Sequence, residues 1–284
     1  MSLSIAEKRA AFRKLHQSGC FILPNAWDIG SARYLASLGF KALASTSAGF
    51  AFSRGVPDNA VGRDAVLEHL RELVEATDLP VNADFENGFA ADPDELAENV
   101  RLGVETGVAG LSIEDSTGDE SRPLFDLDHA VARIRAARKT IDKSGCDVLL
   151  VGRAECFLVG RPDIDETTKR LKAYADAGAD CLYAPDIRER KHVAAVVKAV
   201  SPKPVNVLIS GPGGLTIDEV VELGGRRISV GGAMARAAWG GFMRAANQLA
   251  KHQRFDGFAG AAPHGELNKF FRKWAFHQRA GRPN

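Results

Sequence analysis

The sequence predicts an α/β protein: a (β/α)8 TIM barrel that forms one domain over residues 1–284, with 252–284 as a C-terminal helical extension. Eight short β-like runs alternate with longer helical patterns, and no linker or low-complexity stretch divides them. The length of 284 residues also suits an α/β barrel, which typically takes about 250 residues. A doubly wound open sheet remains the alternative, because one misassigned strand would leave only seven β-α units.

The eight β-like runs are short, and most of them are apolar on both faces in their first half. That pattern is typical of strands buried on both sides, as in a parallel sheet covered by helices. In chain order the expected strands are 21–27, 42–47, 80–85, 110–115, 148–155, 181–186, 204–209 and 227–232.

Helical patterns fill the gaps between these runs. Residues 94–106 carry an apolar stripe at helical spacing, with Asp92 as the expected N-cap and Pro93 at the first helical position. Residues 127–140 form a second amphipathic pattern. Glycine follows four of the helical stretches, where a left-handed C-cap favours it: Gly39, Gly107, Gly178 and Gly224.

Two helical segments follow the eighth expected strand, at 233–251 and 264–277. The second is surplus to eight β-α units and is rich in aromatic residues. Together they carry more apolar surface than a terminal helix needs, so we expect them to contribute to contacts between subunits. The aromatic residues are Phe270, Phe271, Trp274 and Phe276.

Composition excludes several classes of protein. Hydrophobic residues make up 45% and charged residues 26% of the chain, a balance that supports folding without disulfides or a structural metal. Lys and Arg total 37 against 36 for Asp and Glu, so neither nucleic acid nor an anionic membrane is expected as a partner. No signal peptide, membrane span or C-x-x-C pair is evident. These features predict a cytoplasmic protein with reduced thiols.

Acidic residues stand at the ends of the third and fourth expected strands, where the active site of a barrel lies. They include Asp84, Glu86 and Glu114. Clustered carboxylates repel one another unless a cation joins them, and oxygen ligands suit Mg²⁺ or Mn²⁺. The sequence therefore favours a metal site at these three residues. The alternative is that they cap helices or pair with nearby arginines.

Arg153 ends the apolar run of the fifth expected strand and is the expected counter-charge to the acids. Its planar guanidinium could also bind a substrate carboxylate, and a purely structural salt bridge is the alternative. None of the seven histidines falls at a strand end, so neither histidine base catalysis nor zinc is expected. The other strand ends supply further candidates for the site: Trp27, Ser45, Ser47, Gly49 and Asn206.

Six motifs in order along residues 21–250 resemble those of the isocitrate lyase/phosphoenolpyruvate mutase superfamily. The resemblance implies a Mg²⁺-dependent barrel, commonly a tetramer built from two dimers that exchange the eighth helix. It also implies chemistry at a C–C or P–C bond next to a 2-oxo acid, through an enolate. The motifs are PNAWD at 24–28, GFKALASTSAGFAFSRGVPD at 39–58, D-x-E-x-G-F at 84–89, GLSIED at 110–115, GRAE at 152–155 and PVNV at 204–207.

The resemblance also assigns roles to individual residues. Asp84 would ligate the metal directly, and Glu86, Glu114 and Asp58 would hold metal-bound waters. Arg153 would contact the 2-oxo acid and the developing oxyanion, so Arg153, Glu114 and Asp58 are the expected catalytic residues. The expected substrate-binding residues, besides Arg153, are Trp27, Ser45, Ser47, Ala48, Gly49 and Asn206.

The loop after the fourth expected strand departs from the lyases of this superfamily. Those enzymes carry a Lys-Lys/Arg-Cys-Gly-His motif there, whereas residues 116–130 read STGDESRPLFDLDHA. We therefore expect a Mg²⁺-dependent lyase or decarboxylase that cleaves a C–C bond of a 2-oxo or 2-hydroxy acid. The alternatives are P–C bond chemistry, as in a phosphonopyruvate hydrolase or a phosphonomutase, and a non-catalytic 2-oxo acid binder.

Overall fold

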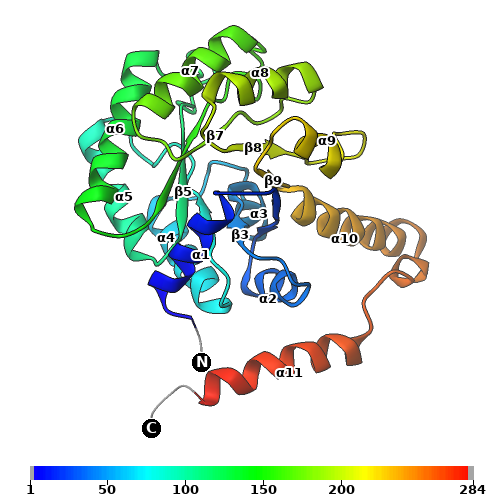
Figure 1. Ribbon diagram of the computed structural model, residues 1–284. Helices are drawn as coiled ribbons and strands as arrows, with labels where there is room; N and C mark the ends of the chain where they lie inside the picture. Colours follow the sequence, from blue (N-terminus) through cyan, green and yellow to red (C-terminus); the bar gives the residue numbers. More distant parts are fainter. Residues whose placement is uncertain (1–2, 281–284) are drawn as a thin grey trace. The chain divides into compact units, whose positions relative to one another are not determined.

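The central feature of the fold is a ring of parallel strands enclosed by helices (Figure 1). The computed structural model describes the backbone of residues 3–280 and the side chains of residues 3–274. Every strand pair in the sheet is parallel, and the order is β1-β9-β8-β7-β6-β5-β4-β3-β2. Because β1 and β2 are separated only by Pro24, the ends of this order meet and the barrel is nearly closed. The predicted α/β barrel is confirmed.

The strands match the eight expected runs, except that the first run forms two strands. Pro24 separates these two, because proline has no N–H to donate to a neighbouring strand. Its carbonyl still accepts a hydrogen bond from the Ala44 N–H, at 2.9 Å. The strands are β1 (Phe21–Leu23), β2 (Asn25–Ala26), β3 (Leu43–Ser45), β4 (Val81–Asp84), β5 (Gly110–Glu114), β6 (Leu149–Arg153), β7 (Cys181–Tyr183), β8 (Val205–Leu208) and β9 (Arg227–Ser229).

The helices of the barrel include two that were not predicted from the sequence, α1 at the N-terminus and the short α3 after β3. Helix α1 starts with a capping box, in which Ser4 and Glu7 satisfy each other's backbone N–H groups. The helices are α1 (Ile5–Leu15), α2 (Ile29–Ser37), α3 (Ser47–Ser53), α4 (Arg63–Ala76), α5 (Pro93–Glu105), α6 (Leu127–Lys143), α7 (Ile164–Asp176), α8 (Arg190–Val200) and α9 (Ile217–Glu222).

The predicted helix ends are confirmed in α5 and at four glycines. The Asp92 side chain accepts hydrogen bonds from the N–H groups of Asp94 and Glu95, and Pro93 is the first helical residue. The glycines expected as C-caps all adopt positive φ, between 85° and 106°: Gly39, Gly107, Gly178 and Gly224.

The lower part of the barrel, at the N-terminal ends of the strands, is polar. The Arg227 guanidinium donates hydrogen bonds to the Asn206 and Asn82 side-chain oxygens, at 2.9 and 3.2 Å. It also lies 3.4 Å from Nε2 of His16, which follows α1. Since His16 Nδ1 lies 2.8 Å from the Phe12 carbonyl and must donate to it, Nε2 is the unprotonated nitrogen that accepts from Arg227. Helix α1 thus contributes to the polar floor of the barrel.

Burial and the charge of Arg227 lower the pKa of His16 to about 3. In the unfolded chain the His16 imidazole takes up a proton near pH 6.5, whereas in the folded protein it stays neutral down to about pH 3. The contribution of His16 to the free energy of unfolding is therefore highest above pH 6.5 and falls as the pH is lowered. Buried carboxylates titrate in the same range with the opposite sign, so we compare the wild type with His16→Gln. When the pH is lowered from 7 to 5, we expect the free energy of unfolding of the wild type, measured in urea, to fall by about 2 kcal/mol more than that of the variant. If the two proteins differ by the same free energy at both pH values, His16 is not neutral in the folded state.

The chain forms two compact units, residues 1–234 and 235–284. Helix α10 (Ala233–His252) begins at their boundary and is followed by the short helix η1 (Asp256–Phe258) and α11 (His264–Ala280). Large apolar side chains are exposed on α10, among them Phe242 at 62% and Met243 at 55%. Of the aromatic residues predicted in the tail, Phe276 lies outside the described side chains.

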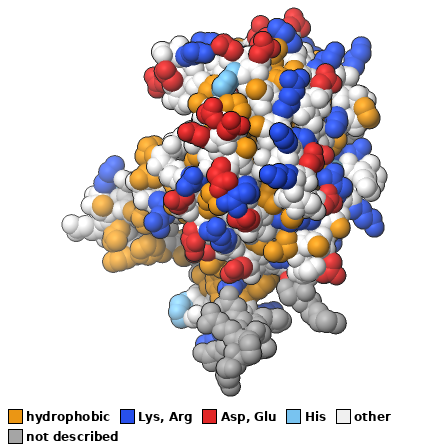
Figure 2. Space-filling view, turned by 90° about the vertical axis from the view of Figure 1, so that its left-hand side faces the viewer, with side chains coloured by type: hydrophobic (Ala, Val, Ile, Leu, Met, Phe, Trp, Pro, Cys, Tyr) orange, Lys and Arg blue, Asp and Glu red, His pale blue; other side chains and the backbone are white. Residues whose placement is uncertain are grey.

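The surface shown in Figure 2 carries acidic and basic side chains intermixed over the barrel, without a region of one sign. Among the described residues, no helix is long and apolar enough to cross a membrane. All four cysteines are free thiols, and Cys156 and Cys181 are buried. Burial raises the pKa of both of these thiols, so neither is an activated nucleophile.

Candidate active site

The carboxyl ends of neighbouring strands bring the candidate residues to one end of the barrel. Ser45 ends β3, Asp84 ends β4, Glu114 ends β5 and Arg153 ends β6. Three of them, Ser45, Asp84 and Arg153, line a cavity of about 140 Å³. Because parallel strands end at one edge of the barrel, residues far apart in the sequence meet here. This is the convergence that the sequence predicts.

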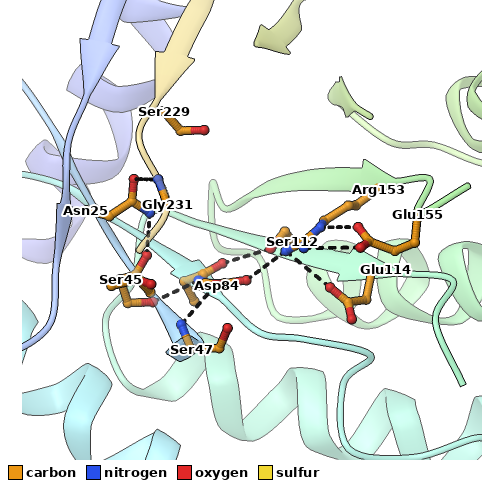
Figure 3. Close-up of polar contacts among 12 residues, drawn as sticks. Asn25, Ser45, Ser47, Asp84, Ser112, Glu114, Arg153, Glu155, Ser229 and Gly231 are labelled. Atoms are coloured by element: carbon orange, nitrogen blue, oxygen red, sulfur yellow. Dashed lines mark hydrogen bonds and ion pairs between the residues drawn. The ribbon is translucent and has the colours of Figure 1, made fainter. Parts of the chain in front are cut away.

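Arg153 is the centre of the charged cluster. Its Nη1 lies 3.0 Å from Oδ1 of Asp84 and 3.1 Å from Oε2 of Glu114. Its Nε donates to Glu155, and Nη2 donates to the same carboxylate at 3.3 Å. Figure 3 shows Arg153 between Asp84 on one side and the two glutamates on the other. The three acids outweigh the effect of burial and hold the pKa of Arg153 well above its usual range, so it is charged.

Asp84 links this cluster to the segment after β3. Its Oδ2 accepts a hydrogen bond from the Ser47 N–H at 3.0 Å, and its own N–H donates to the Ser45 hydroxyl at 2.8 Å (Figure 3). Asp84 is therefore fixed by two serines on one side and by Arg153 on the other. Its side chain stays 18% exposed, so it faces the cavity.

Carboxyl groups outnumber cationic groups in this cluster. Burial and the Asp84 and Asp58 charges raise the pKa of Glu86 to about 8. Burial raises the pKa of Glu114 well above its usual range, and the Arg153 charge only partly offsets this. Burial and the Asp84 charge also raise the pKa of Asp58. One guanidinium does not compensate this set of acids.

Glu86 deviates from the geometry expected from the sequence. Strand β4 ends at Asp84, so the strand alternation that would put Glu86 on the same face does not continue to it. Glu86 instead adopts a positive φ of 49°, a strained conformation for a glutamate, while its carbonyl accepts a hydrogen bond from the Glu114 N–H at 3.1 Å. No described side chain donates a hydrogen bond to its carboxylate. Glu86 is thus a buried acid that forms no ion pair with any of the described residues.

The donor set fits Mg²⁺ or Mn²⁺ held partly through water. Among the described residues, no group of three or more His, Cys, Asp and Glu side chains is arranged to hold a metal by direct ligation. Mg²⁺ commonly keeps several waters and uses one or two carboxylates, which matches one direct ligand, Asp84, at the cavity wall. A divalent cation there would offset the Asp84 charge, which after burial is the next cause of the raised pKa values of Glu86 and Asp58.

A buried network behind the cluster holds Arg153 and Glu155 in place. Oδ1 of Asp115 accepts from the Glu155 N–H at 2.8 Å. Its Oδ2 accepts from the Tyr174 hydroxyl at 2.5 Å and from Nη1 of Arg170 at 3.0 Å. Because Asp115 is fully hydrogen-bonded and only 2% exposed, it fixes the backbone from which the Glu155 side chain reaches Arg153.

The expected carboxylate-binding segment, Ser45 to Gly49, has few free donors. The Ser47 N–H donates to Asp84, and the Gly49 N–H donates to the Thr46 hydroxyl at 3.2 Å, as part of the N-cap of α3. The Ala48 N–H has no acceptor among the described residues, and Ala48 lines the cavity. Ala48 is therefore the best backbone donor for a ligand, whereas Gly49 does not line the cavity.

Two other expected substrate contacts, Trp27 and Asn206, differ in their position relative to the cavity. Trp27 does not line the cavity, and its backbone N–H donates to the Ser31 hydroxyl at the start of α2. Asn206 does line the cavity, but its amide is engaged by Arg227 and by Ser229. Asn25 is the first residue of β2. Its side-chain oxygen accepts hydrogen bonds from the N–H groups of Val230 and Gly231, just after β9.

The structure gives contacts to residues for which the sequence predicts no role. Glu155, which follows Arg153 by two residues at the end of the fifth expected strand, is the closest partner of Arg153. The Tyr183 ring lies 5.2 Å from the Arg153 guanidinium carbon and lines the cavity. Arg227 lines its floor, and nothing in the sequence distinguishes this arginine from others on strands.

Comparison with known families agrees with this arrangement. The model of the phosphoenolpyruvate phosphomutase family matches residues 12–250. A crystal structure of a protein from Burkholderia cenocepacia J2315, described as a candidate lyase/mutase, is 49% identical. The match covers 94% of this chain and 97% of that chain, with a TM-score of 0.92. A second structure from the same organism, described as a candidate phosphonomutase, is 36% identical over 86% of this chain and 99% of that one, with a TM-score of 0.79.

Two curated relatives extend the comparison. An uncharacterized protein of Mycobacterium tuberculosis is 33% identical over 223 residues, which cover 78% of this chain and 81% of the relative. The oxaloacetate decarboxylase of Pseudomonas aeruginosa is 29% identical over 201 residues, 68% of each chain.

Proposed function

The chain belongs to the isocitrate lyase/phosphoenolpyruvate mutase superfamily, and on that premise we propose that it is a Mg²⁺-dependent lyase or decarboxylase. Its substrate is a 2-oxo or 2-hydroxy acid, in which a C–C bond is cleaved through an enolate. The observation that carries this proposal is the contact of Arg153 with Asp84, both of which line the cavity, and with Glu114. It combines a fixed cation with surplus carboxylates that suit a divalent ion.

The residues of the chain would share the work as follows. Asp84 would hold the metal directly, and Glu86, Glu114 and Asp58 would orient its waters. Arg153 binds the 2-oxo acid and stabilises the negative oxygen of the enolate. Ala48 N–H and the serines at 45 and 47 orient the substrate carboxylate. When bound, Mg²⁺ would supply Lewis acidity to the 2-oxo acid.

Cleavage of a P–C bond is the second candidate. The similarity to the candidate phosphonomutase supports P–C cleavage. The similarity to the oxaloacetate decarboxylase supports C–C cleavage. A panel of oxaloacetate, methylisocitrate and phosphonopyruvate, each with and without Mg²⁺, separates the two. We expect release of a 2-oxo acid from a C–C substrate only with Mg²⁺. Turnover of phosphonopyruvate, with no turnover of oxaloacetate or methylisocitrate, would favour the second candidate. Binding of these acids without turnover of any of them would indicate a non-catalytic binder.

We also propose that the protein assembles as a dimer of dimers in which α10 is exchanged between subunits. The support is the apolar surface of α10, where Trp239, Phe242 and Met243 are 39%, 62% and 55% exposed. Exposed apolar side chains at this density on one helix are typical of a contact surface.

Assembly is tested by sedimentation. We expect the wild type to sediment as an oligomer at micromolar concentration, and Phe242→Glu to shift it to smaller species, because a charge would be buried in the contact. Leu38→Glu, at a 58% exposed leucine of the barrel, serves as the control and should not change the sedimentation coefficient. A stable wild-type monomer would contradict the proposal.

A further inference from the structure

Bond cleavage next to the carbonyl of a 2-oxo acid leaves an enolate, whose carbon then needs a proton. The loop after β5, residues 116–126, contains no cysteine, and none of its residues lines the cavity. Among the described residues that do line it, none is a histidine, cysteine or lysine. The two lining carboxyl groups, Asp58 and Asp84, serve the metal in the proposed function. The other side chains there that can give up a proton are hydroxyls of the barrel wall.

Tyr183 supplies the most acidic of these hydroxyls, because a phenol is a stronger acid than the alcohol of serine or threonine. It ends β7, where parallel pairing places it beside Arg153 on β6 and Asn206 on β8. Paired residues of neighbouring strands point to the same side of a sheet, so the three side chains enter the barrel together, and all three line the cavity. The other tyrosines, Tyr34 and Tyr174, do not line it.

The Tyr183 side chain is held at the level of Arg153. It packs in a small apolar cluster with Val151 and, at the edge of the cluster, Leu208. The centre of its ring lies 5.2 Å from the Arg153 guanidinium carbon, and the residue is only 8% exposed. The phenol also interacts with the Ser229 side chain on β9, two strands away, so it reaches past β8 inside the barrel.

The phenol is protonated when the substrate arrives. Burial raises the pKa of Tyr183 to about 12, although the Arg153 charge acts in the opposite direction. At neutral pH the group is therefore a proton donor. Transfer to an enolate carbon is favourable because a C–H bond next to a carbonyl is a weaker acid than a phenol. The Arg153 cation beside the ring stabilises the phenolate that remains.

We propose that Tyr183 is the general acid of this site and protonates C3 of the enolate. The inference rests on the proposed function and names the group that completes its reaction. When the C3–C4 bond of oxaloacetate breaks, CO₂ leaves and the electron pair of the bond stays on the enolate. The Tyr183 O–H bond then breaks as a C–H bond forms at C3, which gives pyruvate, and water returns a proton to the phenolate. Hydrolysis of phosphonopyruvate would leave the same enolate.

Tyr183→Phe removes the phenolic proton and keeps the ring, so it separates bond cleavage from protonation. The test is a single turnover of oxaloacetate with Mg²⁺ and excess enzyme, in which CO₂ and pyruvate are measured separately. In the wild type both products should appear at the same rate. In Tyr183→Phe we expect CO₂ to appear at the wild-type rate and pyruvate to form roughly 10²-fold more slowly, because only solvent can protonate the enolate.

Tyr34→Phe makes the same change at a 52% exposed tyrosine outside the cavity, and both of its rates should match the wild type. Oxalate calorimetry with Mg²⁺ should give equal affinities for Tyr183→Phe and the wild type, which shows that the variant is folded and binds the acid head. A weaker oxalate affinity in Tyr183→Phe would place the tyrosine in binding of the acid head and contradict the inference.

The remaining outcomes separate the inference from the proposed function. If CO₂ and pyruvate still appear together in Tyr183→Phe, at the wild-type rate or equally slowed, the inference is overturned while the proposed function stands. For a wild type that turns over only phosphonopyruvate, phosphate replaces CO₂ in the same test. Turnover of methylisocitrate alone overturns the inference, because its pyruvate leaves without passing through the enolate. A wild type that turns over no acid of the panel overturns both.

Discussion

Replacing Asp84 with asparagine is expected to lower activity by roughly 10²–10³-fold and to abolish measurable Mg²⁺ binding. Asparagine keeps the shape of the side chain and can still accept from the Ser47 N–H, but it carries no charge. It therefore removes the direct ligand and one partner of Arg153 together. Activity assays and Mg²⁺ calorimetry on the same preparation measure both effects.

The matched control for this change is Asp176→Asn. Asp176 is the last residue of α7 and is exposed, so its loss should leave activity and Mg²⁺ affinity unchanged. Urea unfolding should show that Asp84→Asn remains folded, because its backbone N–H still donates to Ser45. Wild-type Mg²⁺ affinity in Asp84→Asn would show that Asp84 is not the ligand.

Replacing Arg153 is expected to separate the role of its charge from that of its shape. Arg153→Lys keeps a cation among the acids, so the fold should persist, but lysine lacks the planar fork that reaches Asp84, Glu114 and Glu155 together. We expect activity to fall roughly 10²-fold. Arg153→Met leaves the acids without a cation and should cost about 3–5 kcal/mol in the free energy of unfolding.

The control is Arg101→Lys, at an exposed arginine that pairs with Glu98 on the surface of α5. It should change neither activity nor stability measurably, since exposed ion pairs contribute little. Equal stability of Arg153→Met and the wild type would mean that the buried acids take up protons in place of the lost cation. Full activity in Arg153→Lys would contradict a role for the guanidinium in binding the substrate.

The sequence predicts the strand ends well because burial on both faces leaves a strong pattern. Asp84, Glu114 and Arg153 each end an apolar run, so their convergence follows from the topology of a parallel barrel. The Asp92 cap and the four C-cap glycines are predicted for a similar reason, since each depends on local backbone chemistry.

The details of the site depend on where each strand stops and how each loop turns. Glu86 lies beyond the end of β4 with positive φ, which no alternation pattern predicts. Trp27 follows a strand end but leaves the cavity because the chain turns at once into α2. Arg227 stands at the start of β9 rather than its end, so a search limited to carboxyl ends misses it.

The central claim is that this cavity binds the head of a 2-oxo acid together with a divalent ion. The most direct test is calorimetry of oxalate binding to the wild-type protein, with Mg²⁺ present and with the ion removed by a chelator. The account predicts that oxalate binds at least about tenfold more tightly with Mg²⁺, because the ion offsets the surplus charge of the acids around Asp84. Equal oxalate affinity under both conditions, or no binding under either, would contradict it.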